Sequence, residues 1–78
     1  MTLTKGSIIK KVTTNADERL KGTVANSELV YEVTRVNKST YTLKCIEGFM
    51  KGSGCKLIKN FNHTTIDVYG TKTEWIKL

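Results

Sequence analysis

The chain contains no proline, one tryptophan, one histidine and two cysteines, and its hydrophobic runs are short. Two cysteines are too few for the dense disulfide framework that holds small secreted domains together. No apolar stretch approaches the roughly 20 residues that a membrane-spanning helix needs, and no charged leader precedes a long apolar segment. These absences argue against a disulfide-stapled module and against a membrane partner, so we expect a soluble, cytoplasmic protein.

Arginine is also scarce, because Arg19 and Arg35 are the only two in a chain whose net charge is +6. Such an excess of positive charge favours an anionic partner, such as nucleic acid, an anionic lipid surface or an acidic protein. Lysine is a hydrated point charge and lacks the rigid fork with which arginine reads guanine edges. If nucleic acid is bound, we expect contacts to its backbone more than to its base sequence.

The length of 78 residues predicts a single small domain, 1–78. A domain of this size buries about 60 to 65% of its unfolded surface, which leaves no room for a large substrate cavity. The bias toward lysine, asparagine and isoleucine, together with the missing proline, is typical of an AT-rich genome such as that of a bacteriophage or a low-GC bacterium. The expected compartment is then the cytoplasm of a bacterium or of a phage-infected host cell.

Alternating apolar and polar residues on both sides of a short polar turn predict a β-hairpin between positions 29 and 47. The apolar residues that share one face are Leu29, Tyr31, Val33, Tyr41, Leu43 and Cys45. Pairing Val33 with Leu43 keeps these residues in register and leaves 37–39 as the loop.

The same register makes two further pairings across the hairpin. It places Glu32 opposite Lys44 and Thr34 opposite Thr42, and both are favourable cross-strand pairs. The local pattern and the pairwise evidence therefore agree on this hairpin.

The segment before the hairpin is less regular. Residues 5–12 predict a first strand in which Ile8 and Val12 can point inward while Ile9 lies on the opposite face, and the pattern leaves open which of the two faces is buried. A capping-box pattern then predicts at most one short helical turn near 16–21, although a long loop is the alternative.

The segment after the hairpin predicts further short strands around 55–61, 66–68 and 76–78, with Trp75 facing away from Ile76. Five or six short strands with few helical signals predict an all-β fold. We expect a small, strongly bent antiparallel sheet or a five- to six-stranded barrel, similar in class to Src-homology-3-like or oligonucleotide-binding barrels.

The glycine-rich segment 48–54 is one candidate binding site. Phe49 offers a stacking face, Met50 adapts to irregular surfaces and Lys51 supplies positive charge. The alternative is a hairpin loop in which Phe49 and Met50 fold back to cap the core.

A basic surface with interleaved aromatic residues is a second candidate, because single-stranded nucleic acid binds such platforms by stacking. Its expected members are Lys10, Lys11, Lys44, Lys56, Lys59, Lys72, Lys77, Tyr41, Tyr69 and Trp75. The alternative is that these lysines solvate the outer faces of strands and protect sheet edges from pairing with other chains.

The cysteines and the histidine suggest weaker alternatives. Cys45 and Cys55 would lie opposite each other in adjacent strands, but we expect two buried free thiols rather than a disulfide. A zinc site with His63 matches no known ligand spacing. His63 and Asp67 could form a catalytic pair, but a histidine at a turn is ordinary, so we expect neither enzyme activity nor a cofactor or metal.

These considerations lead to one function and one alternative. The first is a small non-enzymatic β-barrel that binds nucleic acid through backbone contacts and aromatic stacking. The alternative is a protein-interaction module that inhibits or redirects a host protein with an acidic surface. A homodimer through an edge strand is a further expectation. The expected binding residues are Lys44, Phe49, Met50, Lys51, Lys56, Lys59, Tyr69 and Trp75.

Overall fold

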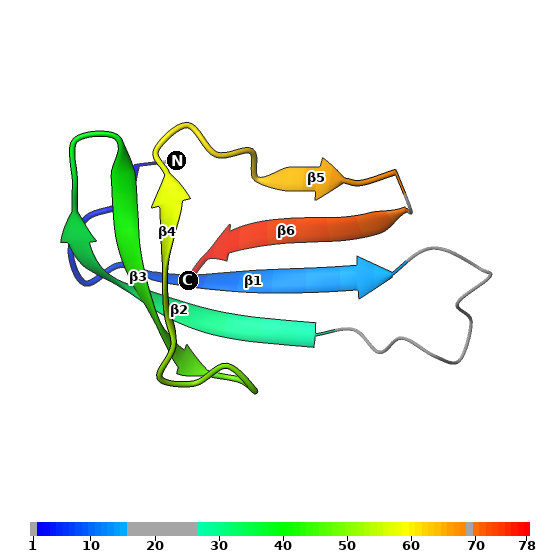
Figure 1. Cartoon of the computed structure of the whole chain (residues 1–78), viewed down its shortest axis with the longest axis horizontal. Coiled ribbons are helices and arrows are strands. Elements are labelled where there is room, and N and C mark those ends of the chain that lie inside the picture. The colour runs from blue at the N-terminus through cyan, green and yellow to red at the C-terminus, as the bar shows by residue number, and fades with distance from the viewer. Residues whose placement is uncertain (1, 16–26, 69) are drawn as a thin grey trace.

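The computed structural model describes residues 2–15, 27–68 and 70–78, and this part of the chain is all β (Figure 1). Six strands form one antiparallel sheet in the order β4-β3-β2-β1-β6-β5. The strands are β1 (Ile8–Asn15), β2 (Ser27–Val36), β3 (Thr40–Glu47), β4 (Gly54–Ile58), β5 (Thr64–Ile66) and β6 (Thr71–Lys77). The predicted all-β class is confirmed, whereas the helical turn predicted near 16–21 lies outside the described residues.

The sheet is strongly curled into a half-barrel. Figure 1 shows β3 and β4 running at a steep angle to β1, β5 and β6, while β2 bends from one direction into the other. The pairing of β2 with β3 shifts register twice, between Val30 and Tyr31 and between Val33 and Arg35. Such bulges bend a strand and increase its twist, so they account for the curl. The edges of the sheet are β4 and β5, and the last strand lies between β1 and β5.

The β2–β3 hairpin has the predicted loop 37–39 and the predicted pairing of Val33 with Leu43. Glu32 also lies opposite Lys44, as expected. The pairing of Thr34 with Thr42 is wrong, because the second bulge makes Thr34 an extra residue.

Polar side chains stabilise the bulge and the hairpin loop. Arg35 takes the position opposite Thr42, and the Thr34 hydroxyl donates to the Thr42 carbonyl oxygen at 3.3 Å. The Asn37 amide donates to the hydroxyls of Thr40 and Thr42 at 3.0 and 2.9 Å. These bonds satisfy polar groups that a regular ladder would otherwise pair.

The core lies on the inner side of the half-barrel. Its buried residues are Leu3, Ile9, Leu29, Tyr31, Val33, Tyr41, Leu43 and Cys45. The six inward residues predicted for the hairpin are therefore confirmed. In the first strand, where the sequence left the buried face open, Ile9 is fully buried and Ile8 and Val12 are half-buried. Ile9 pairs with Tyr31, so its side chain shares the face of that core residue.

The pairings assign every strand residue to one of two faces, because side chains alternate along a strand. We call the face that carries Ile9, Tyr31 and Leu43 the inner face, and the opposite one the outer face. Trp75 pairs with Lys11, two residues from Ile9, so both lie on the inner face. Ile76 lies on the outer face and is 42% exposed.

Candidate binding face

An aromatic cluster extends from the core toward the edge strand β5. The Trp75 ring centroid lies 5.9 Å from that of Tyr31 and 6.1 Å from that of Phe61, and Phe61 lies 5.5 Å from His63. These distances are typical of favourable aromatic pairs. Tyr31 is buried, Phe61 and Trp75 are half-buried, and His63 is exposed. The cluster therefore connects the core to an accessible aromatic surface.

The backbone fixes this cluster in place. The amide of Trp75 on β6 donates to the carbonyl oxygen of His63 at 2.8 Å, which ties the segment before β5 to β6. Phe61 and Trp75 also pack against the core. Tyr31 and Trp75 are therefore held by strands β2 and β6, and backbone bonds to Ile58 and Trp75 anchor the connection 59–63 that carries Phe61 and His63.

One lysine lies over Trp75 of this cluster, and another lies over the core residue Tyr41. The Lys11 Nζ lies 5.5 Å from the Trp75 ring centroid, and the Lys59 Nζ lies 5.8 Å from the Tyr41 ring centroid. Both distances are within the range of cation–π attraction. Lys77 pairs with Ile9 and so lies on the same inner face, where it is exposed.

Negative charge is segregated to the other face. The pairings place all the glutamates on the described strands on the outer face: Glu28, Glu32, Glu47 and Glu74. Two of them neutralise lysines there, in the pairs Lys10–Glu28 and Lys72–Glu74, each at 3.1 Å. The inner face of the described strands carries Lys11 and Lys77 without a carboxylate. It is therefore the more positive of the two faces.

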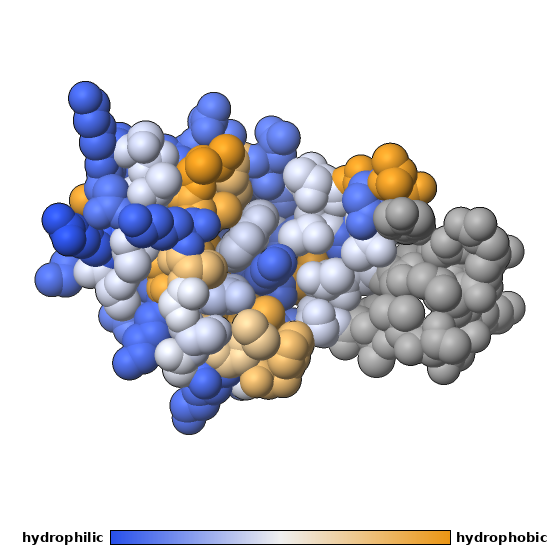
Figure 2. All heavy atoms as spheres, viewed as in Figure 1, coloured by the Kyte–Doolittle hydropathy of each residue, from blue (hydrophilic) through white to orange (hydrophobic). Residues whose placement is uncertain are grey.

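A row of hydroxyl groups runs across four strands next to the aromatic cluster. Thr13 on β1 pairs with Ser27 on β2 and with Thr73 on β6, and Thr73 pairs with Thr65 on β5. Within the described residues, none of these four hydroxyls makes a hydrogen bond, and none is sealed from solvent. Figure 2 shows a pale, weakly polar strip over β1 and β6. We call these four residues the hydroxyl row.

Sequence reasoning missed the hydroxyl row, because its members come from four separate segments. Thr13 and Thr73 each lie two residues from a predicted binding residue, Lys11 and Trp75 respectively. The signal needed to find the row is the strand order β2-β1-β6-β5, which no local pattern contains.

The predicted single basic and aromatic surface is wrong, because its members lie on two faces. The pairings place Lys10, Lys44, Lys56 and Lys72 on the outer face, whereas Lys11, Lys77 and Trp75 lie on the inner face. Tyr41 is buried, Lys59 follows β4, and Tyr69 lies outside the described residues. Alternation within strands separates residues that are close in sequence.

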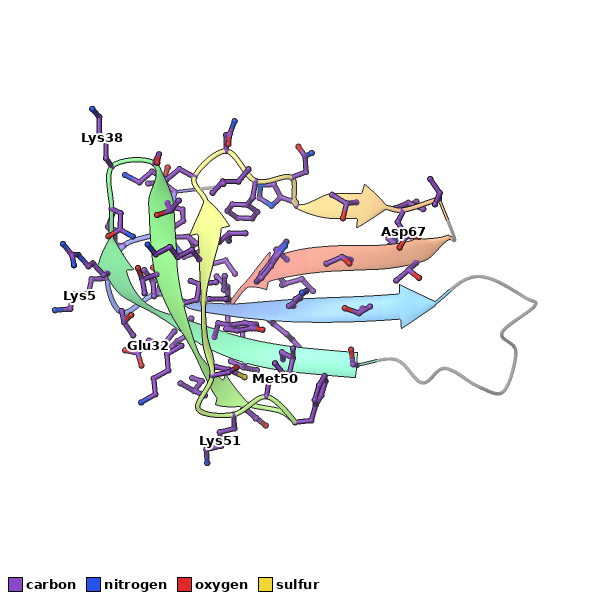
Figure 3. All side chains as sticks on the ribbon, viewed as in Figure 1. Lys5, Glu32, Lys38, Met50, Lys51 and Asp67 are labelled. Carbon is purple, nitrogen blue, oxygen red and sulfur yellow. The ribbon has the colours of Figure 1, made fainter. Side chains whose placement is uncertain are left out.

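The loop 48–53 between β3 and β4 presents its apolar residues to solvent. Phe49 is 77% exposed and Met50 is 44% exposed, so neither folds back over the core. The Ser53 hydroxyl and amide both donate to the Met50 carbonyl oxygen, at 2.7 and 3.0 Å, which closes the turn. Figure 3 shows Met50 and Lys51 at the lower end of the β3–β4 hairpin, far from Lys38 and Lys5.

The cysteines do not lie opposite each other as predicted. Cys55 pairs with Leu43, and both cysteines are free; Cys45 is buried, but Cys55 is exposed. Cys55 is at an edge strand, which explains why the expectation of two buried thiols is wrong. Partial desolvation raises the pKa of the Cys55 thiol, and the charge of Lys11 opposes that shift.

His63 and Asp67, the pair considered for catalysis, each contact another residue. The ring of His63 packs against Phe61, while the Asp67 carboxylate accepts a hydrogen bond from the Thr71 amide at 3.0 Å. Among the described residues, no group of three histidine, cysteine or acidic side chains could hold a metal ion.

Comparisons with protein-family models, with curated proteins and with solved structures found no match. In the described ranges, no helix is long and apolar enough to cross a membrane.

Proposed function

We propose that this protein binds single-stranded nucleic acid, without catalysing a reaction, on the inner face of β1, β6 and β5. The observation that carries the proposal is the contact of Lys11 with the Trp75 ring on the inner face, whose described strand positions carry no carboxylate. Aromatic side chains on a basic surface bind single strands because bases stack on them and phosphates contact the lysines. Each stacked base contributes about 1 to 3 kcal/mol in known cases.

A single strand fits this face better than a duplex does. Trp75 and Phe61 are half-buried in a curled sheet, and a base must leave its own stack to reach such rings. The cations of this face are lysines, which contact phosphates without reading base edges. We therefore expect weak sequence preference.

Salt dependence tests the proposal directly. Two phosphate contacts, from Lys11 and Lys77, predict that log K falls with log salt concentration with a slope of about −1.4 for a single strand. The measurement is fluorescence anisotropy of a labelled strand of about ten nucleotides, between about 50 and 200 mM salt.

A matched pair of variants locates the surface. Lys11→Gln should weaken binding and reduce the slope by about 0.7, because one phosphate contact is lost. Lys10→Gln removes the same charge from the neighbouring outer-face position and should leave the slope unchanged. Equal effects of the two variants, or no binding to any single strand at low salt, would contradict the proposal.

The exposed Phe49 favours a second candidate function, which is docking to a protein with an acidic surface. An exposed aromatic residue two positions from Lys51, in a loop closed by backbone hydrogen bonds, has the character of an interface anchor. This function predicts a stoichiometric protein partner that survives nuclease treatment and is lost with Phe49→Ala. Loss of the partner on nuclease treatment would instead favour nucleic-acid binding.

A further inference from the structure

We propose that the inner face selects RNA over DNA because the hydroxyl row hydrogen-bonds to ribose 2′-hydroxyls. The inference rests on the proposed function, since it concerns the same face and names the class of nucleic acid. The 2′-hydroxyl is the group by which a protein distinguishes RNA from DNA at a given site.

The position of the hydroxyl row fits this role. Thr73 lies two residues from Trp75 along β6, and Thr13 lies two residues from Lys11 along β1. Two residues of a strand span about 6.6 to 6.8 Å, so each hydroxyl is one step away from a stacking ring or a cation. A strand whose base stacks at Trp75 therefore has its sugar within reach of the row.

The chemistry of the row also favours a sugar over a phosphate. A hydroxyl both donates and accepts, as the 2′-hydroxyl does, whereas phosphate oxygens accept only. Lys11 and Lys77 already supply donors for phosphate on this face. Ser27, Thr13 and Thr73 are half-buried, without a hydrogen-bond partner among the described residues, and remain open to solvent. They therefore have unused hydrogen-bonding capacity where a ligand would lie.

Threonine is common in strands because its β-branched side chain packs well there, so a purely structural role is the competing explanation. The outer face carries threonines on the same strands, among them Thr14 on β1 and Thr64 on β5. There the Lys72–Glu74 ion pair interrupts the hydroxyls, whereas the inner row is continuous over four strands. A hydroxyl removed from the outer face is therefore a matched control for a hydroxyl removed from the inner row.

The test compares oligouridine of about ten nucleotides with oligodeoxyuridine of the same length, so that the bases are identical. The full chain should bind the RNA at least about threefold more tightly, which is the effect of a single net hydrogen bond. Thr73→Val and Thr13→Val keep the β-branched shape and remove the hydroxyl. Each should lower affinity for RNA by about threefold and leave affinity for DNA unchanged.

Thr64→Val is the control, since it removes a hydroxyl from the outer face of β5 and should change neither affinity. Equal binding of RNA and DNA would overturn the inference and leave the proposed function standing. An RNA preference that persists in the Thr13→Val, Thr73→Val double variant would overturn the assignment to the hydroxyl row. Binding to neither strand would overturn the proposed function and the inference together.

Discussion

The two halves of the curled sheet use the same inner face in different ways. On β2 and β3, five inward residues are less than 7% exposed: Tyr31, Val33, Tyr41, Leu43 and Cys45. On β1, β6 and β5, the inward positions beyond Ile9 include Lys11, Trp75 and three members of the hydroxyl row, all half-buried or exposed.

In both halves, alternation along the strands decides which side chains point inward. The type of residue at those positions decides whether the inner face excludes water. The apolar half excludes water and supplies most of the hydrophobic stabilisation. The other half keeps polar and charged groups on a face that an ordinary core would fill with aliphatic residues. That difference makes the first half the folding core and is the reason for proposing that the second half binds a ligand.

The largest expected effect is the loss of stability on truncating the apolar half. Leu43 is 1% exposed, so Leu43→Ala should lower the free energy of unfolding by about 2 to 5 kcal/mol. Thr73→Val in the other half should change it by less than about 0.5 kcal/mol, because no buried contact is lost. Urea unfolding followed by Trp75 fluorescence measures both, and equal losses would contradict the division between the halves.

The glycines of the loop 48–53 provide a second comparison. Gly48 has φ +116°, and an added Cβ would lie 2.6 Å from the Leu29 Cδ2 and 2.9 Å from the Glu28 carbonyl oxygen. Gly48→Ala therefore combines backbone strain of about 1 to 3 kcal/mol with a steric clash.

Gly52 is the matched control, because it has φ +93° and open space around an added Cβ. Gly52→Ala should show the strain alone, so it should destabilise the fold by at least about 1 kcal/mol less than Gly48→Ala. The midpoints of urea unfolding report this difference. If the two variants had the same midpoint, close packing of the loop against β2 would be contradicted.

Alkaline pH should lower the stability of the fold through Cys55 and Tyr31. Desolvation raises the pKa of Cys55 above its ordinary value of 9.0 and that of Tyr31 above 10.0. The folded state then holds these protons more tightly than the unfolded state, so the free energy of unfolding falls as pH rises through this range.

The thiol contribution can be separated with Cys55→Ser. This variant should lose less stability than the unaltered chain between about pH 8 and pH 10, because its hydroxyl does not titrate there. Urea unfolding at a series of pH values measures the two slopes. Parallel pH profiles would show that the thiol is not desolvated in the folded state.

The smallest expected effect concerns the outer-face ion pairs. Lys10 and Glu28 are 30% and 58% exposed, so solvent screens their attraction. Glu28→Gln should change the free energy of unfolding by about 0 to 1 kcal/mol. A larger loss, measured by urea unfolding at low salt, would mean that the outer face contributes to folding more than its exposure indicates.

Local patterns in the sequence were sufficient for the hairpin and insufficient for the binding face. The β2–β3 pairing follows from side-chain parity, since Val33 and Leu43 each belong to a regular apolar series. The first strand carries apolar residues on both faces, and its pairing with Tyr31 selects Ile9 for the core. The bulge at Thr34 depends on the curl of the sheet, which short-range alternation does not encode.

The face of Trp75 was settled by long-range pairing. Its parity opposes that of Ile76, but the sequence alone leaves open which of the two points inward. The pairing of β6 with β1 places Trp75 beside Lys11 on the inner face. The same long-range order assembles the hydroxyl row, so neither feature was accessible from one segment.

The most direct test of the central claim is a fluorescence titration, because Trp75 is the only tryptophan in the chain. Single-stranded RNA added at about 50 mM salt should quench Trp75 emission in a saturable manner, and raising the salt to about 200 mM should reverse the change. Binding detected by anisotropy of a labelled strand without any change in Trp75 emission would place the ligand on another surface and contradict the account.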